Sequence, residues 1–192
     1  LMEGGIQVSG GFATLTNVSI SNVAQTAVRV LGGVMEGNTL HIISSNGALG
    51  GAIFVEDGTL TLNDSVLEGN EAGEGGAIYA LESTLSLVDT RIENNTASLG
   101  GGAQLVASDL TCVGQANTSY GFFSNTQYGI SVDEASSVIA TNCDVQDNLP
   151  EDIQAPEYTY FAAEDGNYTR GQGMCGSSVA HSVSGLLVDN YS

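Results

Sequence analysis

Residues 50–74 read GGAIFVEDGTLTLNDSVLEGNEAGE and residues 75–99 read GGAIYALESTLSLVDTRIENNTASL, two copies of one unit. Matching positions are offset by 25 along the chain, as Ile53 and Ile78 illustrate. A fixed period in this range is typical of a solenoid, in which each repeat stacks on the one before it. The two copies therefore predict the fold, and the rest of the chain can be compared with them.

Each unit has strand periodicity and no helical pattern. Apolar Leu60 and Leu62 alternate with Thr59 and Thr61, and Gly, Asn and Asp separate the short runs. We therefore expect an all-β, right-handed parallel β-helix with about 25 residues per coil and inward ladders along its axis. The ladders are Ile53/Ile78, Leu60/Leu85, Leu62/Leu87, Leu67/Ile92 and an asparagine pair, Asn70/Asn95.

Looser copies extend the pattern to about six coils over residues 1–148. Closing asparagines are expected at Asn22, Asn46, Asn70 and Asn95, and Asn148 closes the last coil. The fifth coil loses the pattern after Cys112, and residues 120–123 are interpreted as a loop or an aromatic plug. The only prolines, Pro150 and Pro156, predict the exit, because proline cannot donate to a sheet ladder. Residues 149–176 are then an exit or cap segment, and residues 177–192 a strand-like tail.

The alternation places two aromatic side chains on the outside of the central coils. Phe54 and Tyr79 follow the inward residues Ile53 and Ile78, and successive side chains of a strand point to opposite faces. The two rings should therefore point outward and form an exposed aromatic stack. A loop that covers the two rings is the alternative.

The repeat resembles that of a known family. Gly-Gly-Ala-Ile followed by apolar-x-x-Asn is similar to the repeats of the polymorphic outer-membrane proteins, bacterial adhesins with right-handed β-helical passengers of the pectate-lyase-like superfold. That family prefers Phe where this chain has Leu67, Ile92 and Val145. The resemblance implies a β-helix and, more distantly, an adhesive function toward host or surface glycans.

The charge excludes several classes of partner. The chain has 3 basic and 22 acidic residues, a net charge of −19, and its basic residues are Arg29, Arg91 and Arg170. Such a chain repels phosphate backbones, anionic membranes and acidic polysaccharides, so we expect no nucleic-acid or membrane partner. No apolar run is long enough for a membrane-spanning helix. The composition favours an extracellular or cell-surface protein, and the start without Met suggests a processed chain or a fragment.

The chain has 3 cysteines, so at least one has no partner within the chain. We predict a Cys143–Cys175 disulfide, which would join the irregular C-terminal part to the last coil. No Cys-x-x-Cys motif or histidine cluster indicates zinc.

The apolar tail predicts self-association. Strand addition by the tail of one subunit to the open end of the next would build a filament, through main-chain hydrogen bonds. The tail folding back onto its own coils is the alternative. The candidate contact residues are Val179, Val183, Leu186, Leu187 and Val188 in the tail and Ile6 and Val8 in the first coil.

We expect no catalytic residues, no cofactor and no metal site. A polysaccharide lyase or hydrolase is the enzymatic alternative, and Arg91, near Asp64, Asp89 and Glu93, is its one candidate residue. Stacked acids such as Glu68/Glu93 make calcium a minor alternative, although no calcium-loop motif is present. Six glycosylation sequons occur, and a chain rich in Asn and Thr also produces such matches by chance. They begin at Asn17, Asn63, Asn94, Asn117, Asn167 and Asn190.

The sequence thus predicts a non-enzymatic extracellular structural protein, a self-assembling filament subunit or an adhesin passenger segment. Surface binding to ice or to a neutral glycan is a further class. The stacks Thr59/Thr84 and Thr61/Ser86 cover two coils only, which is too few for a regular plane.

Overall fold

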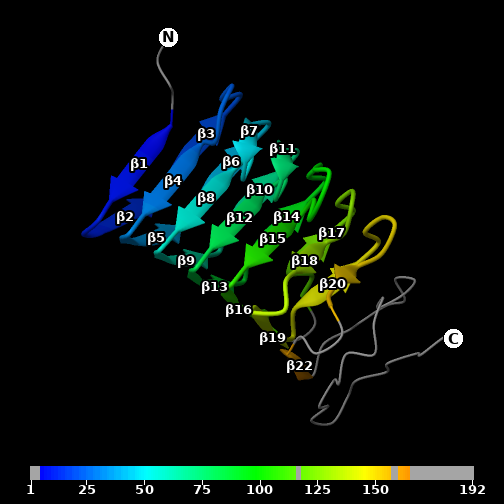
Figure 1. Ribbon diagram of the computed structural model, residues 1–192. Coiled ribbons are helices and arrows are strands. Elements are labelled where there is room, and N and C mark those ends of the chain that lie inside the picture. The colour runs from blue at the N-terminus through cyan, green and yellow to red at the C-terminus, as the bar shows by residue number, and fades with distance from the viewer. Residues whose placement is uncertain (1–4, 116–117, 157–159, 165–192) are drawn as a thin grey trace, which may run out of the picture.

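The computed structural model of this protein describes residues 5–115, 118–156 and 160–164 (Figure 1). These residues form parallel strands and turns, with no helix. Figure 1 shows the strands stacked coil upon coil from β1 at one end to β22 at the other. The all-β solenoid of about six turns is confirmed.

Three long parallel sheets run along the solenoid, and a short fourth one lies between the third and the first. The first sheet contains β1 (Ile6–Ser9), β4 (Val28–Leu31), β8 (Ile53–Glu56), β12 (Ile78–Leu81), β15 (Ala103–Val106), β18 (Ile130–Val132) and β21 (Ile153–Gln154). The second contains β2 (Phe12–Thr16), β5 (Val34–Asn38), β9 (Thr59–Asn63), β13 (Thr84–Val88), β16 (Asp109–Val113), β19 (Ser137–Thr141) and β22 (Tyr160–Glu164). The third contains β3 (Ser19–Ser21), β6 (His41–Ile43), β10 (Val66–Glu68), β14 (Arg91–Glu93), β17 (Gly121–Phe123) and β20 (Asp144–Gln146), and the fourth pairs β7 (Asn46–Leu49) with β11 (Glu71–Glu74).

The inward ladders have the register that the 25-residue period predicts. Ile53 pairs with Ile78, Leu60 with Leu85 and Leu67 with Ile92. Each of these side chains is at most 1% exposed, and they belong to one continuous core cluster. One coil cannot bury its own apolar side chains, so neighbouring coils supply the core jointly.

The corners between sheets use left-handed backbone at fixed positions. Asp57 and Glu82 turn the chain from the first sheet to the second with φ of 50° and 48°. Gly50 turns it into the first sheet with φ of 61°, and a Cβ there would lie 2.1 Å from the carbonyl oxygen of Ile53. No side chain fits that contact, which explains the glycine that opens each Gly-Gly-Ala-Ile motif.

An asparagine ladder lies inside the corner between the third and fourth sheets, but two of its predicted members are wrong. Asn22 has left-handed backbone with φ of 55°, and Asn46 starts β7. The ladder position in that coil belongs to Ser45, whose backbone N–H donates to Asn70 Oδ1 at 3.0 Å. Asparagine serves both the left-handed corner position and the buried position after it, so the sequence alone confused the two. The members that hydrogen-bond in series are Asn70, Asn95, Asn125 and Asn148.

The fifth coil is regular apart from an insertion. Phe122 pairs with Ile92 and is fully buried, so β17 is an ordinary strand of the third sheet. The expected loop or plug at residues 120–123 is therefore wrong. The extra residues of this coil lie before β17, so they do not disturb the corner that follows this strand. Asn125 therefore occupies the next ladder position, although it is 30 residues from Asn95.

The predicted end of the solenoid at residue 148 is also wrong. The chain passes through a cis Leu149–Pro150 bond and then forms β21, which pairs with β18. β22 continues the second sheet by pairing with β19. Pro150 lies in the turn, where no ladder donor is needed, so it does not end the stack. The tail at residues 177–192 lies outside the described residues.

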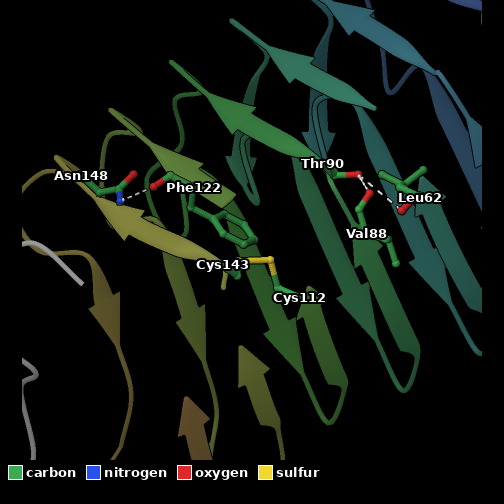
Figure 2. Close-up of a disulfide and its surroundings, with 7 residues drawn as sticks. All are labelled: Leu62, Val88, Thr90, Cys112, Phe122, Cys143 and Asn148. Atoms are coloured by element: carbon green, nitrogen blue, oxygen red, sulfur yellow. Dashed lines mark hydrogen bonds between the residues drawn. A yellow bond between two sulfur atoms is a disulfide. The ribbon is translucent and has the colours of Figure 1, made fainter. Parts of the chain in front are cut away.

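The structure joins Cys112 to Cys143, so the predicted Cys143–Cys175 pair is wrong; Cys175 lies outside the described residues. Cys112 occupies the same inward ladder position as Leu87, in the coil after it. In the coil after Cys112, this ladder position belongs to Ala140. Cys143 follows Ala140 by three residues, at the corner. Figure 2 shows that the equivalent two positions also meet two coils earlier, where the hydroxyl of Thr90 at the corner donates a hydrogen bond to the carbonyl of Leu62 at 3.4 Å. A corner side chain thus reaches the inward residue of the preceding coil, which brings the two sulfur atoms together.

Candidate binding surface

The outer face of the second sheet, here called the threonine-rich face, is an array of mostly short or β-branched side chains. Its members alternate with the buried residues of β2, β5, β9, β13, β16 and β19. The first row is Phe12, Val34, Thr59, Thr84, Asp109 and Ser137. The middle row is Thr14, Glu36, Thr61, Ser86, Thr111 and Ile139, and the third row is Thr16, Asn38, Asn63, Val88, Val113 and Thr141.

Threonine and serine stacking on this face is longer than the sequence indicated. The middle row stacks Thr61, Ser86 and Thr111 over three successive coils, where two were expected. Glu36 and Ile139 end this run, so the face is not a regular threonine plane. It is nevertheless rich in β-branched side chains, which are stiff and present a firm surface.

Exposed apolar side chains concentrate on the same face. Among the described residues four large hydrophobic side chains are exposed, and three of them belong to it: Phe12 at 67%, Ile139 at 40% and Val34 at 39%. Phe12 and Val34 are partners in neighbouring strands. Ile139 lies four coils beyond Val34 on the same sheet, so the face carries exposed apolar side chains at both of its ends, separated by the hydroxyl-rich central coils.

The threonine-rich face carries almost no charge, although the chain is strongly acidic. Glu36 and Asp109 are the charged members of its three rows. Each already accepts a hydrogen bond on the face, Glu36 Oε1 from Asn38 at 3.1 Å and Asp109 Oδ1 from Ser137. The face therefore offers hydroxyl, amide and methyl groups to a partner, with little net field.

The prediction of an exposed aromatic stack is half correct. Phe54 and Tyr79 point outward and stack with ring centroids 5.7 Å apart and planes 4° apart. They are only 7% and 9% exposed, so the stack is buried. The Arg29 guanidinium lies 5.0 Å from the Phe54 centroid, and Gln104 follows Tyr79 on the next strand. Since neighbouring coils cover the ring faces, the rings stabilise the stack of coils and leave no face for a ligand.

The surroundings of Tyr79 are apolar and acidic. Burial raises the pKa of its phenol, and the nearby carboxylates of Glu74, Asp133 and Glu56 raise it further. Gln104 Oε1, on the next strand, is buried and has no hydrogen-bond partner. Both features follow from the close packing of these outward side chains against the neighbouring coils, and no ligand is needed to explain them.

Arg91, the candidate residue of the enzymatic alternative, is held by its neighbours. Its guanidinium forms an ion pair with Glu93, donates to the carbonyl oxygen of Ser119 at 3.1 Å and lies 5.2 Å from the Phe123 ring centroid. Asp89 Oδ2 instead accepts a hydrogen bond from Gln115. The structure thus brings Arg91 together with Glu93, at the edge of the insertion in the fifth coil.

The predicted subunit contacts are placed only in part. Val8 is 7% exposed, and Ile6 packs against the core cluster from a half-buried position, so both side chains point inward. The backbone of β1 pairs with β4 on one side. The tail residues Val179, Val183, Leu186, Leu187 and Val188 lie outside the described residues.

Among the described residues no group of three or more His, Cys, Asp or Glu side chains is placed to hold a metal ion. The described part of the chain also has no helix of the length and hydropathy needed to cross a membrane.

Comparison with known proteins gives one match. The family described as "Right handed beta helix region" matches residues 4–190, which is nearly the whole chain. No curated protein and no solved structure matches the chain.

Proposed function

This chain belongs to the right-handed β-helix family, and we propose that it is a non-catalytic extracellular structural protein that binds a neutral polysaccharide surface through its threonine-rich face. The observation that carries the proposal is the scarcity of charge on this face, which also includes three of the four exposed large hydrophobic side chains of the described residues. The polymorphic outer-membrane resemblance of the repeats agrees with an adhesive role.

The charge distribution favours a neutral partner. With a net charge of −19 the chain repels polyanions, and a polycation would be drawn to the acidic corners, where Asp57 and Glu82 lie. A polymer with many hydroxyl groups needs donors, acceptors and short apolar contacts. The rows of Thr, Ser, Asn and Val side chains supply all three.

The size of the face favours a polymer over a second copy of the chain. Six strands about 4.8 Å apart, each five residues of about 3.3 Å, give a plane of roughly 450 Å². A stable protein pair buries about 800 Å² on each partner. A polymeric surface compensates for weak single contacts because many chains or many sites are engaged together.

The test is retention on insoluble neutral polysaccharides, namely microcrystalline cellulose, chitin, β-glucan and mannan particles. We expect the folded protein to bind at least one of them, with little dependence on salt, since no ion pairs form. The double variant Thr61→Glu/Ser86→Glu places two charges in the middle row and should abolish retention. The double variant Ser21→Glu/Ser98→Glu, at two exposed positions outside this face, adds the same charge, is the matched control and should bind like the wild type.

Two outcomes would overturn the proposal. Failure of the wild-type protein to bind any of the four particles removes the neutral polysaccharide as partner. Retention that survives Thr61→Glu/Ser86→Glu moves the contact to another surface. Far-UV circular dichroism of each variant shows that the β-helix is intact.

The self-assembling filament subunit is the second candidate. Within the described residues β1, β2 and β3 are the terminal strands of their sheets, and an unpaired strand edge accepts further strands. Sedimentation velocity over a range of protein concentrations distinguishes the candidates. A filament subunit gives growing species without polysaccharide, whereas a binding module remains monomeric.

A further inference from the structure

Three glycosylation sequons begin in the described part of the chain, and the structure distinguishes them. Asn17 and Asn94 are exposed and lie at corners with left-handed backbone, φ of 53° and 56°. The hydroxyl residues that complete their sequons, Ser19 and Thr96, are exposed as well. An N-linked glycan is bulky and hydrophilic, and it requires a surface position of this kind.

The third sequon, at Asn63, is engaged in the fold. Asn63 Nδ2 donates to Asn38 Oδ1 at 2.9 Å, within the third row of the threonine-rich face. Its hydroxyl residue, Ser65, is 1% exposed. The Ser65 hydroxyl accepts from the Leu40 backbone N–H at 3.0 Å and donates to the Asn63 carbonyl at 2.8 Å. Both functional groups of this sequon are thus hydrogen-bonded within the fold, the Asn63 amide on the outer face and the Ser65 hydroxyl in the interior.

We propose that the secreted chain is N-glycosylated at Asn17 and Asn94 and is not glycosylated at Asn63. Asn17 lies before β3, where the strands of the third sheet begin, and Asn94 directly follows β14, where these strands end. The two sites therefore lie at opposite ends of the strands of the third sheet. Asn17 directly follows Thr16, so a glycan there borders the threonine-rich face at its first coil, whereas Asn94 lies at the far end of the third-sheet strands.

The modification is a group transfer catalysed by an oligosaccharyltransferase. The side-chain amide nitrogen of asparagine forms a bond to the anomeric carbon of a lipid-pyrophosphate-linked oligosaccharide. The bond between that carbon and the pyrophosphate oxygen breaks, the lipid pyrophosphate leaves, and the amide nitrogen loses one proton. A glycan on the exposed corner amides of Asn17 and Asn94 is compatible with the fold, whereas a glycan on Asn63 would occupy the amide nitrogen that bonds Asn38 in the folded chain.

The test is expression of the whole chain behind a cleavable export signal in a eukaryotic secretory host. Treatment with peptide N-glycosidase, an amidase that hydrolyses the Asn side-chain amide, in heavy-oxygen water converts each glycosylated Asn to labelled Asp, and peptide mass spectrometry then reads every sequon separately. The sequons at Asn117, Asn167 and Asn190, outside the described residues, are thereby kept apart from the three under test. We expect label at Asn17 and Asn94 in most molecules and none at Asn63.

Matched variants check each site. Asn17→Gln and Asn94→Gln should each remove one glycan, and Asn63→Gln should leave the glycan mass unchanged. Thr96→Ala should abolish modification at Asn94, and Thr96→Ser should retain it. An unlabelled Asn17 or Asn94 in secreted protein with the β-sheet dichroism of the fold overturns the proposal, and so does label at Asn63.

Discussion

The asparagine ladder gives the sharpest prediction about stability, and Asn95 is the residue to change. Its Nδ2 donates to the carbonyl of Leu67 and to Asn125 Oδ1, both at 3.0 Å. Its Oδ1 accepts from the backbone N–H and the Nδ2 of Asn70, at 2.9 and 3.0 Å. The residue is fully buried, so Asn95→Ala removes four hydrogen bonds where water cannot replace them.

The size of the effect follows from what is left without a partner. Asn70 Nδ2 still bonds the Ile42 carbonyl, and Asn125 Oδ1 still accepts from the backbone N–H of Asn95. The Asn70 N–H and one lone pair of the Leu67 carbonyl lose their partners, and each buried unsatisfied group costs about 1–3 kcal/mol. We expect Asn95→Ala to destabilise the protein by about 4 kcal/mol, a large share of the roughly 5–15 kcal/mol that holds a domain folded.

Urea unfolding followed by far-UV circular dichroism measures this loss. With a slope of about 2 kcal/mol per molar urea, the midpoint should fall by about 2 M. Asn63→Ala is the control, because it removes one half-buried hydrogen bond to Asn38 and should cost about 1 kcal/mol or less. Equal midpoint shifts for the two variants would refute the reasoning.

Asn95→Asp separates hydrogen bonding from packing, because it keeps the side-chain size. The new carboxyl group can still accept from Asn70, but when ionised it has no proton to donate to Leu67 and Asn125. Burial and these acceptor oxygens raise its pKa above the usual Asp value. Its proton is held more tightly in the folded state, so the variant is most stable at acid pH and loses stability as pH rises. A loss equal at all pH values would show that packing, and not the hydrogen-bonding pattern, dominates.

Three further predictions concern other positions. Non-reducing peptide mapping should recover Cys112 linked to Cys143, and recovery of a bridge between Cys143 and Cys175 would contradict the structure. Replacing both cysteines by Ala should lower the free energy of unfolding by about 3–4 kcal/mol, since the bridge spans 31 residues. Ser45→Asn should raise stability by about 1 kcal/mol, because it extends the ladder by one coil at a residue whose Oγ has no hydrogen-bond partner; an unchanged or lower urea midpoint would show that the coil cannot hold the larger side chain. The raised pKa of Tyr79 means that the folded state holds the phenol proton more tightly than the unfolded state does. This contribution to stability is therefore full below the ordinary pKa of 10.0 and is lost as pH rises through the raised pKa. Tyr79→Phe should weaken this alkaline loss of stability, and an unchanged alkaline profile would contradict the prediction.

The inward half of the fold could be predicted from the sequence because its apolar positions recur in every coil and keep a constant offset through the central units. Ile53 and Ile78, or Leu60 and Leu85, must be apolar in every coil, and the constant offset of 25 shows that they meet. The insertion before β17 breaks this arithmetic. Leu87 to Cys112 is still 25 residues, but Cys112 to Ala140 is 28, so the position of Cys143 beside Cys112 could not be counted from the central units.

Corner positions were harder to predict because one residue type meets two demands. Asn94 and Asn95 are neighbours in one motif, yet the first supplies left-handed backbone and the second a buried amide. In other coils the left-handed position is filled by Ser44 or Gly69, and the buried one by Ser45. An isolated asparagine therefore does not reveal which of the two positions it occupies.

The outward positions show why the threonine-rich face was not apparent from the sequence. An outward residue need not be apolar, so its row has no repeating signature, and the row becomes visible only when the register of all coils is known. Ile139 joins Thr111 at an offset of 28, and Thr14 joins Glu36 at an offset of 22, so neither belongs to a period of 25. Residues that determine the fold are thus constrained coil by coil, whereas those of the proposed binding face would be constrained only as a surface. Single changes that keep this surface uncharged should preserve retention, whereas a charge introduced at Thr61 or Ser86, in the centre of the middle row and one or two coils beyond the native Glu36, should weaken it.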